Sequence, residues 1–313
     1  MWFKQVQFFQ LQTPIPYNAS KLTDQLQTFV FTPCLPSFPA SYGWVSPVEE
    51  EDAPLVHAVN GNMMICLQFE EKILPTTVIR QELLKKIKLL ELERGRRVPQ
   101  KEKYVIKEEL IQTLLPKAFT RISRTYAYID TKNNWLVIDS ISTAKVDKIL
   151  DLLKKSLLAA DIKLVTAKLA PTLTHWLVHE NYPDVFSIEK SGVLMDPSNE
   201  GHVIRCQQQD LSANAIQLII KEGCEVKQMA LAWNELINFV LADDFTLRNI
   251  KYQDKVIDQA NEMEPETLRK QFEVDFLIMA ETLSQLLREL YDLFIPAEKT
   301  EPVAEITTAE ALQ

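Results

Sequence analysis

The order of apolar and polar residues along this 313-residue chain predicts a mixture of strands and helices. Residues 2–12 partly alternate apolar with polar side chains, as a half-buried strand does. Residues 121–130 and 135–140 flank the tetrapeptide TKNN, which predicts the turn of a β-hairpin. The proline-rich, acidic residues 33–56 predict a surface loop. Further strands are predicted over residues 62–69, 162–166 and 203–211, and a three-stranded meander over 225–254.

Two consecutive helices are predicted in the middle of the chain. The first begins at Pro75-Thr76 and is interrupted at Gly95, and the second runs from about Lys101 to Leu115. The first helix carries one apolar stripe, and the turn between the helices is crowded with arginine. We therefore expect a projecting helical hairpin. The stripe consists of Ile79, Leu83, Ile87 and Leu90.

The last helix, over residues 267–294, is the longest and carries apolar residues at helical spacing, which predicts a structural position in a core. Its stripe is Phe272, Phe276, Met279, Leu283, Leu286, Leu290 and Leu293. Shorter helices are predicted over residues 21–30, with Ser20 as the N-cap, and over 144–158, 172–180 and 212–223.

Strands and helices follow one another without strict alternation, so the fold is predicted to be α+β, with mixed, curved sheets, helices and the projecting hairpin. The length allows two or three cores. We divide the chain into a central α/β region (1–72 plus 117–170), the basic hairpin (73–116) and a C-terminal α+β region (171–295). The acidic tail (296–313) is expected to be disordered.

Positive charge is concentrated between residues 72 and 124. This basic block holds 14 Lys and Arg against six Glu, a net charge of +8, whereas the whole chain carries −9 and the remainder therefore −17. Such a local field attracts polyanions to an acidic protein. The plainer interpretation is a pair of solvated, lysine-rich helices. The tryptophans do not interleave with the basic residues, so the pattern favours contact with a duplex backbone over stacking of single-stranded bases.

Composition gives little support for other classes of protein. With only six glycines, the chain has no glycine-rich phosphate-binding motif. Its four cysteines show no C-x-x-C spacing, so neither a disulfide framework nor a zinc site is predicted. No signal peptide and no run of about 20 apolar residues is found, which predicts a cytoplasmic protein without a membrane partner.

Two pairs of residues could carry metal chemistry, and each has a plainer interpretation. His175 and His179 lie four residues apart on a predicted helix, but no supporting ligand accompanies them. Asp243-Asp244 could bind a divalent ion as in a nuclease, although two acids before a strand more often form a turn. We predict no catalytic residue, no cofactor and no metal, and hence no enzyme.

Two sequence runs are specific enough to suggest a family. Residues 70–75 are EEKILP, and residues 114–121 are LLPKAFTR. Shorter runs continue the match collinearly from residue 2 to about residue 294: WFK at 2–4, FTPC at 31–34, GWV at 43–45, LLKKSL at 152–157, VIR at 203–205, QDL at 209–211, LR at 247–248 and DF at 275–276. With these runs the chain resembles the RdgC family of recombination-associated bacterial proteins.

The resemblance implies a DNA-binding protein of the bacterial nucleoid that is not an enzyme. Members of the family form ring-shaped homodimers, closed by two separate contacts around a basic hole wide enough for a duplex. They bind DNA with little sequence preference, restrain RecA-driven strand exchange and support the repair of replication forks. The expected partners are double-stranded DNA, a second copy of the chain and RecA.

The resemblance also assigns roles to individual residues. Phe119 is expected at a ring-closing contact, although the sequence alone favours a position in the monomer core. Gln208 and Gln209 are expected at the dimer interface. Members commonly carry lysines where this chain has Gln207 and Gln208, so its DNA binding is expected to be weaker or more sensitive to salt. The charge of the basic block, independently of the resemblance, predicts contacts to phosphate for Lys85, Lys88, Arg94, Arg96, Arg97, Lys117, Arg121 and Arg124.

Two alternatives remain open on the sequence. The basic block could contact RecA or another partner with an acidic surface, which would make the chain a protein–protein regulator of recombination. The Asp243-Asp244 pair could serve a metal-dependent nuclease.

Overall fold

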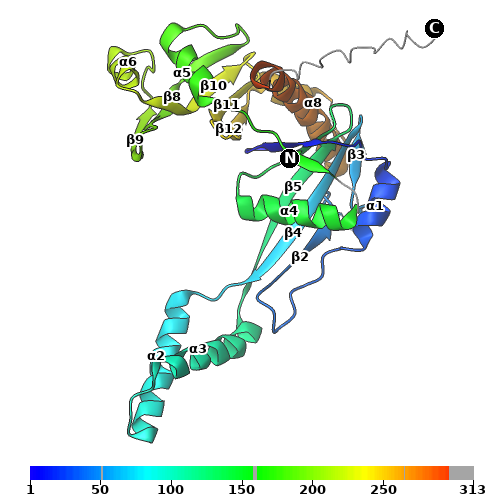
Figure 1. The fold of residues 1–313 in the computed structure, drawn as a ribbon. Helices are drawn as coiled ribbons and strands as arrows, with labels where there is room; N and C mark the ends of the chain where they lie inside the picture. The colour runs from blue at the N-terminus through cyan, green and yellow to red at the C-terminus, as the bar shows by residue number, and fades with distance from the viewer. Residues whose placement is uncertain (51, 158–160, 264, 296–313) are drawn as a thin grey trace, which may run out of the picture.

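The computed structural model describes residues 1–50, 52–157, 161–263 and 265–295, which form an elongated α+β molecule (Figure 1). A central sheet occupies the middle, a helical hairpin extends from one end of it, and a second sheet lies at the other end. The predicted disordered tail, residues 296–313, lies outside the described residues. None of the described helices combines the length and the apolar character needed to cross a membrane.

The central sheet has seven strands in the order β2-β4-β5-β6-β1-β7, with β3 paired to β4. Its long strands β4 and β5 pair antiparallel along their whole length, and β5 continues into β6 through the predicted hairpin turn. The bounds are β1 Gln7–Leu11, β2 Ala40–Val45, β3 His57–Val59, β4 Asn62–Lys72, β5 Thr120–Asp130, β6 Trp135–Ile138 and β7 Ile162–Leu164.

The prediction that residues 33–56 form only a loop is wrong, because β2 lies within them and pairs with residues 66–71 of β4. The reason is Trp44, whose side chain is fully buried and donates a hydrogen bond from Nε1 to Ser156 Oγ at 3.0 Å. Burying this large side chain outweighs the local signal of the neighbouring prolines.

Helices α1 (Ala19–Gln27) and α4 (Thr143–Ser156) pack on one face of the central sheet. Their buried residues, among them Leu22 and Ile149, join Ile65 and Ile129 of the sheet in one core. The N-cap of α1 is Asn18, which accepts a hydrogen bond from the Lys21 amide, so the assignment of this cap to Ser20 is wrong. Both residues are good N-caps, and the helix begins two residues earlier than its apolar pattern suggests.

The second sheet has five strands in the order β12-β11-β10-β8-β9. The predicted meander is confirmed as β10 (Glu225–Trp233), β11 (Ile237–Ala242) and β12 (Leu247–Tyr252). Strand β8 (Phe186–Asp196) was not predicted, and the strand expected over 203–211 is β9 (Asn199–Gln207), which begins and ends four residues earlier. The named strands of both sheets pair antiparallel.

The largest core joins the two sheets and is covered by α8 (Leu268–Phe294). An antiparallel bridge between Val6 and Leu247 links the sheets directly. The prediction of a structural last helix is confirmed, because the middle of its stripe is buried in this core and only Leu293 at its end is exposed. Helices α5 (Ala170–His179) and α6 (Asn214–Lys221) also contribute buried residues to it, and α7 (Asp254–Glu262), which was not predicted, packs on α8.

The two middle helices are α2 (Thr76–Arg94) and α3 (Gln100–Leu114), which pack against each other away from the rest of the molecule (Figure 1). Ile87, Val98 and Ile106 form a small core between them. Gly95 ends α2 with a φ of +62°, a left-handed conformation that a glycine adopts without strain. A short 3-10 turn, η1 (Leu115–Lys117), returns the chain to β5.

Candidate nucleic-acid interface

The eight predicted phosphate-contacting residues are distributed from the hairpin to the central sheet. Lys85, Lys88 and Arg94 lie on α2, and Arg96 and Arg97 lie in the turn between α2 and α3. The other three follow the hairpin, with Lys117 in η1 and Arg121 and Arg124 on β5. All eight side chains are exposed except that of Arg124, which is half-buried.

Half of these cations have carboxylate partners. Lys85 Nζ lies 2.6 Å from Glu82, and Arg94 pairs with Glu102 on α3. The two arginines of β5 are paired as well, one with Glu71 and one with Glu49. Ion pairs this exposed contribute little stability, so a phosphate could replace the carboxylate, but the paired acid lowers the local potential.

The other four cations have no ion-pair partner within the described part of the chain. They are Lys88, Arg96, Arg97 and Lys117. Arg96 and Arg97 are adjacent in an exposed turn, and Val98 beside them is anchored through its amide, which donates to Glu91 at 3.0 Å. Among the eight predicted residues, the turn between α2 and α3 therefore brings together two adjacent cations without an ion-pair partner in the described structure.

Arg121 and Arg124 do not act on the same surface. The pairing of β5 with β4 runs from Thr120 to Asp130 without a register shift, so side chains three residues apart point to opposite faces of the sheet. Arg124 Nε donates to Gln68 Oε1 at 3.1 Å on its own face. The eight predicted phosphate contacts therefore do not form one surface, because a straight DNA backbone cannot contact both arginines on the same face of the sheet.

Phe119 lies just before β5 with 85% of its surface exposed, so the alternative that places it in the monomer core is wrong. Its backbone is fixed, since its carbonyl oxygen accepts a hydrogen bond from the Ile73 amide at 2.7 Å. Two further exposed apolar side chains, Ile73 and Ile122, belong to the same end of the sheet. An apolar side chain on an ordered backbone is typical of an interaction site.

Gln208 and Gln209 follow β9 in the second sheet, at the opposite end of the molecule from the hairpin (Figure 1). Both side chains are exposed. Gln208 has a φ of +52°, and the Gln209 amide donates to the Lys190 carbonyl at 3.0 Å, which holds the end of β9 against β8. The two predicted contact regions of the chain are therefore separate.

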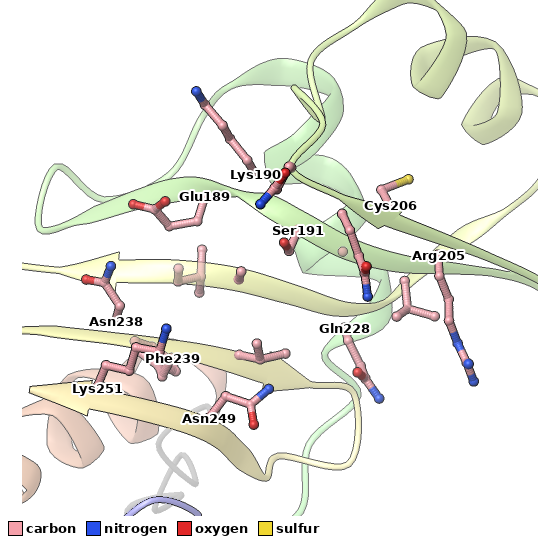
Figure 2. A pocket seen from close by; sticks show the side chains of 17 residues that line it. Glu189, Lys190, Ser191, Arg205, Cys206, Gln228, Asn238, Phe239, Asn249 and Lys251 are labelled. Carbon is pink, nitrogen blue, oxygen red and sulfur yellow. The ribbon is translucent and has the colours of Figure 1, made fainter.

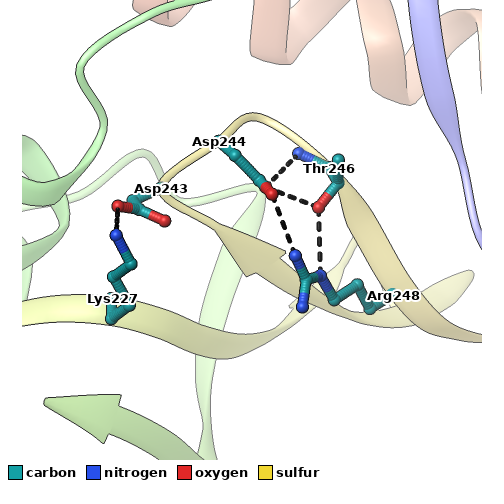
Figure 3. A network of polar contacts seen from close by, with 5 residues as sticks. All are labelled: Lys227, Asp243, Asp244, Thr246 and Arg248. Atoms are coloured by element: carbon teal, nitrogen blue, oxygen red, sulfur yellow. Dashed lines mark hydrogen bonds and ion pairs between the residues drawn. The ribbon is translucent and has the colours of Figure 1, made fainter. Parts of the chain in front are cut away.

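The Asp243-Asp244 pair forms a charged turn between β11 and β12 (Figure 3). Asp243 pairs with Lys227, whereas Asp244 accepts hydrogen bonds from the Thr246 amide at 3.1 Å, the Thr246 hydroxyl at 2.6 Å and Arg248 at 2.9 Å. The two carboxylates turn away from each other, each toward its own cation. The structure agrees with the interpretation of this pair as a turn.

The geometry also gives no support to a metal site at the histidine pair or to a reactive cysteine. The rings of His175 and His179 lie side by side on α5, with centroids 4.4 Å apart. Across the described residues, no group of three or more His, Cys, Asp or Glu side chains could hold a metal ion. Burial raises the pKa of the Cys66 thiol to about 12, which keeps it protonated and unreactive.

Sequence reasoning missed a second group of cations. Lys190, Arg205 and Lys251 come from β8, β9 and β12, and all three border one groove on the second sheet. Their separation in the chain hides them from a count of charge along the sequence. The one available signal was strand alternation, which places polar residues on the solvent side of each strand.

Comparison with known proteins identifies the family. The family model described as "Putative exonuclease, RdgC" matches residues 1–296. The recombination-associated protein RdgC of Aeromonas hydrophila is 35% identical over 293 residues, which cover 93% of this chain and 97% of that protein. The protein of the same name from Yersinia pestis is 36% identical over 294 residues, with the same coverage. Both of these relatives are named for recombination, whereas the description of the family model mentions an exonuclease. The chain belongs to the RdgC family.

Proposed function

We propose that this protein binds duplex DNA without sequence preference, as a ring-shaped homodimer that encircles the duplex, and performs no chemistry. In this role it would restrain RecA-dependent recombination and support the repair of replication forks in the nucleoid. The observation that carries the proposal is the uncompensated charge of Arg96 and Arg97 at the exposed turn of the hairpin, in a chain of a family whose members are named for recombination.

Backbone contact accounts for the absence of sequence preference. Arginine binds phosphate through forked hydrogen bonds, and phosphate contacts carry no sequence information. Each neutralised phosphate adds about −0.9 to the slope of log affinity against log salt. One such contact therefore makes the affinity at 0.15 M salt about five times that at 1 M salt. The four predicted phosphate contacts that have no ion-pair partner among the described residues would therefore give DNA binding that weakens strongly as the salt concentration rises.

The separation of Phe119 from Gln208 and Gln209 supports a ring. In a two-fold dimer each surface patch meets its own copy. This chain is elongated and has two such patches at opposite ends. Two copies that meet at both patches enclose a hole between them. The exposed Phe119 would form one contact, and the end of β9 would form the other.

A second candidate function is a regulator that binds a protein such as RecA through the basic block. One observation favours it: apolar side chains interrupt the charged surface of the hairpin, with Leu92 82% and Tyr104 62% exposed. Mixed apolar and basic surfaces are typical of protein interfaces, whereas a phosphate backbone offers no apolar partner.

Fluorescence anisotropy with three unrelated duplexes of equal length tests the proposal. We expect the same affinity for all three within about threefold, and a linear fall of log affinity with log salt. The measurement is made without magnesium and then repeated with it. No binding at low salt would remove the proposed function, and shortening of the DNA on addition of magnesium would instead support an exonuclease. Binding of RecA with no binding of DNA would favour the regulator.

A further inference from the structure

An open groove of about 890 Å³ lies on the second sheet (Figure 2). All five strands of that sheet contribute to its floor or its rim. On the other face of the sheet, Leu231, Phe239 and Leu241 are buried in the large core. One face therefore holds the sheet in the fold, and the other is left open to solvent.

The floor of the groove is built from small side chains. Ala230 and Val240 face each other across β10 and β11, and Ser191 lies on β8 beside them. The only aromatic residue among the lining residues is Phe239, whose side chain is buried. A ligand on this floor meets small side chains and no exposed ring on which a base could stack, which disfavours single-stranded nucleic acid.

Three cations border the groove, and none has an ion-pair partner within the described ranges. They are Lys190, Arg205 and Lys251, and all three are exposed. The groove has a single acid, Glu189, so its lining carries a net charge of +2 in a chain of −9. The other cations of the sheet, Lys227 and Arg248, are already paired with aspartates (Figure 3).

Five amide side chains add hydrogen-bonding capacity to this charge. None of them makes a side-chain hydrogen bond to another described residue, so each offers both a donor and an acceptor to a ligand. Lysine, arginine and amide side chains are the groups that contact phosphate and sugar oxygens in DNA complexes. The five are Gln207, Gln208, Gln228, Asn238 and Asn249.

The width of the face fits a duplex better than a small anion. Arg205 lies on β9 and Lys251 on β12, the two edge strands, and four strand spacings of about 4.8 Å separate them by roughly 19 Å. The major groove of DNA is about 12 Å wide, so cations this far apart can reach phosphates on both of its sides. A single phosphate could not contact both edges.

We propose that this groove is a surface on which a DNA duplex lies, held through its phosphate backbone by Lys190, Arg205 and Lys251. The inference rests on the proposed function and extends it, because it moves a main site of backbone contact from the hairpin to the second sheet. The Gln207 amide can also donate to a phosphate oxygen, although it adds no charge.

The test replaces Lys190, Arg205 and Lys251 together by Gln and measures duplex affinity by fluorescence anisotropy between 0.05 and 0.3 M salt, a range of about sixfold. A matched control replaces Lys21, Lys154 and Lys163 by Gln; these are exposed lysines on α1, α4 and β7 with the same total charge. We expect the groove variant to bind on the order of 100-fold more weakly at 0.15 M salt, with a slope shallower by about 2.7, and the control to match the wild type.

A second variant, Gln228→Glu with Asn238→Asp, keeps the shape of the groove while adding two negative charges, and we expect it to weaken binding as well. If the wild type binds and the groove variants bind like the control, the groove inference is wrong and the proposed function stands. If the wild type itself does not bind, the proposed function fails. If the groove variants sediment as monomers while the control remains a dimer, the groove holds a second copy of the chain, and the inference is overturned.

Discussion

The substitution Phe119→Ala distinguishes two roles for this residue, a contact between subunits and a place in the monomer core. The side chain is 85% exposed in the single chain, so its removal leaves no cavity. Substitutions at such surface positions usually change the free energy of unfolding by less than about 0.5 kcal/mol. We therefore expect the melting temperature of a dilute sample to match that of the wild type.

The effect on the proposed ring is expected to be much larger. Burying a phenylalanine contributes about 1.5–3 kcal/mol, and a two-fold contact buries the side chain of both subunits, which gives about 3–6 kcal/mol. At 1.4 kcal/mol for each factor of ten, the equilibrium between open and closed ring shifts toward the open form by about 10²- to 10⁴-fold. An open ring releases its duplex, so dissociation from DNA accelerates.

The assay follows dissociation of the protein from a fluorescent duplex after an excess of unlabelled duplex is added, beside a thermal melt. Tyr104→Ala is the control, because it removes an exposed aromatic side chain near the start of α3, whereas Phe119 follows the end of that helix. Faster dissociation for Phe119→Ala alone, with an unchanged melt, supports the reasoning. A melting temperature lowered by many degrees, or dissociation equal to the wild type, would refute it.

Three further predictions concern the hairpin, the core and pH. The double variant Arg96→Ala/Arg97→Ala should weaken all duplexes equally, by about 30-fold at 0.15 M salt, and flatten the salt slope by about 1.8; a new sequence preference in anisotropy would contradict this. Truncation at Pro265 removes α8 from the largest core and should give insoluble protein, so a soluble truncate that binds DNA would argue against the core assignment. His57 is buried against Phe272 and Phe276, and burial lowers its pKa below 6.5, with Glu273 opposing and Arg269 reinforcing the shift. The unfolded state then binds the proton more tightly, so the free energy of unfolding should fall as pH decreases below 6.5. In urea melts, His57→Phe should lose this part of the pH dependence.

Local signals made the hairpin and the last helix predictable. Pro75, Gly95 and Pro116 mark helix ends through their own backbone preferences, and the stripe of α8 has a clear helical period. The opposite directions of Arg121 and Arg124 were also available from the sequence, because an interval of three residues on a strand changes the face. The basic block was treated as one surface only because its residues are close in the chain.

Features that depend on distant pairing could not be predicted in this way. Strand β2 lies among prolines and exists because β4 pairs with it and Trp44 is buried beneath α4. Arg205 and Lys251 are 46 positions apart and border one groove only because the strand order puts β9 and β12 on the two edges of a single sheet. Charge counted along the sequence does not record sheet order.

A topological measurement tests the central claim, that a closed ring holds the duplex, most directly. The protein is mixed at low salt with linear duplex that has cohesive ends, half of the sample is ligated into circles, and the salt is then raised. Backbone contacts alone weaken equally on both forms. The ring account predicts that protein stays on the circles and leaves the linear duplex, and equal loss from both forms would contradict it.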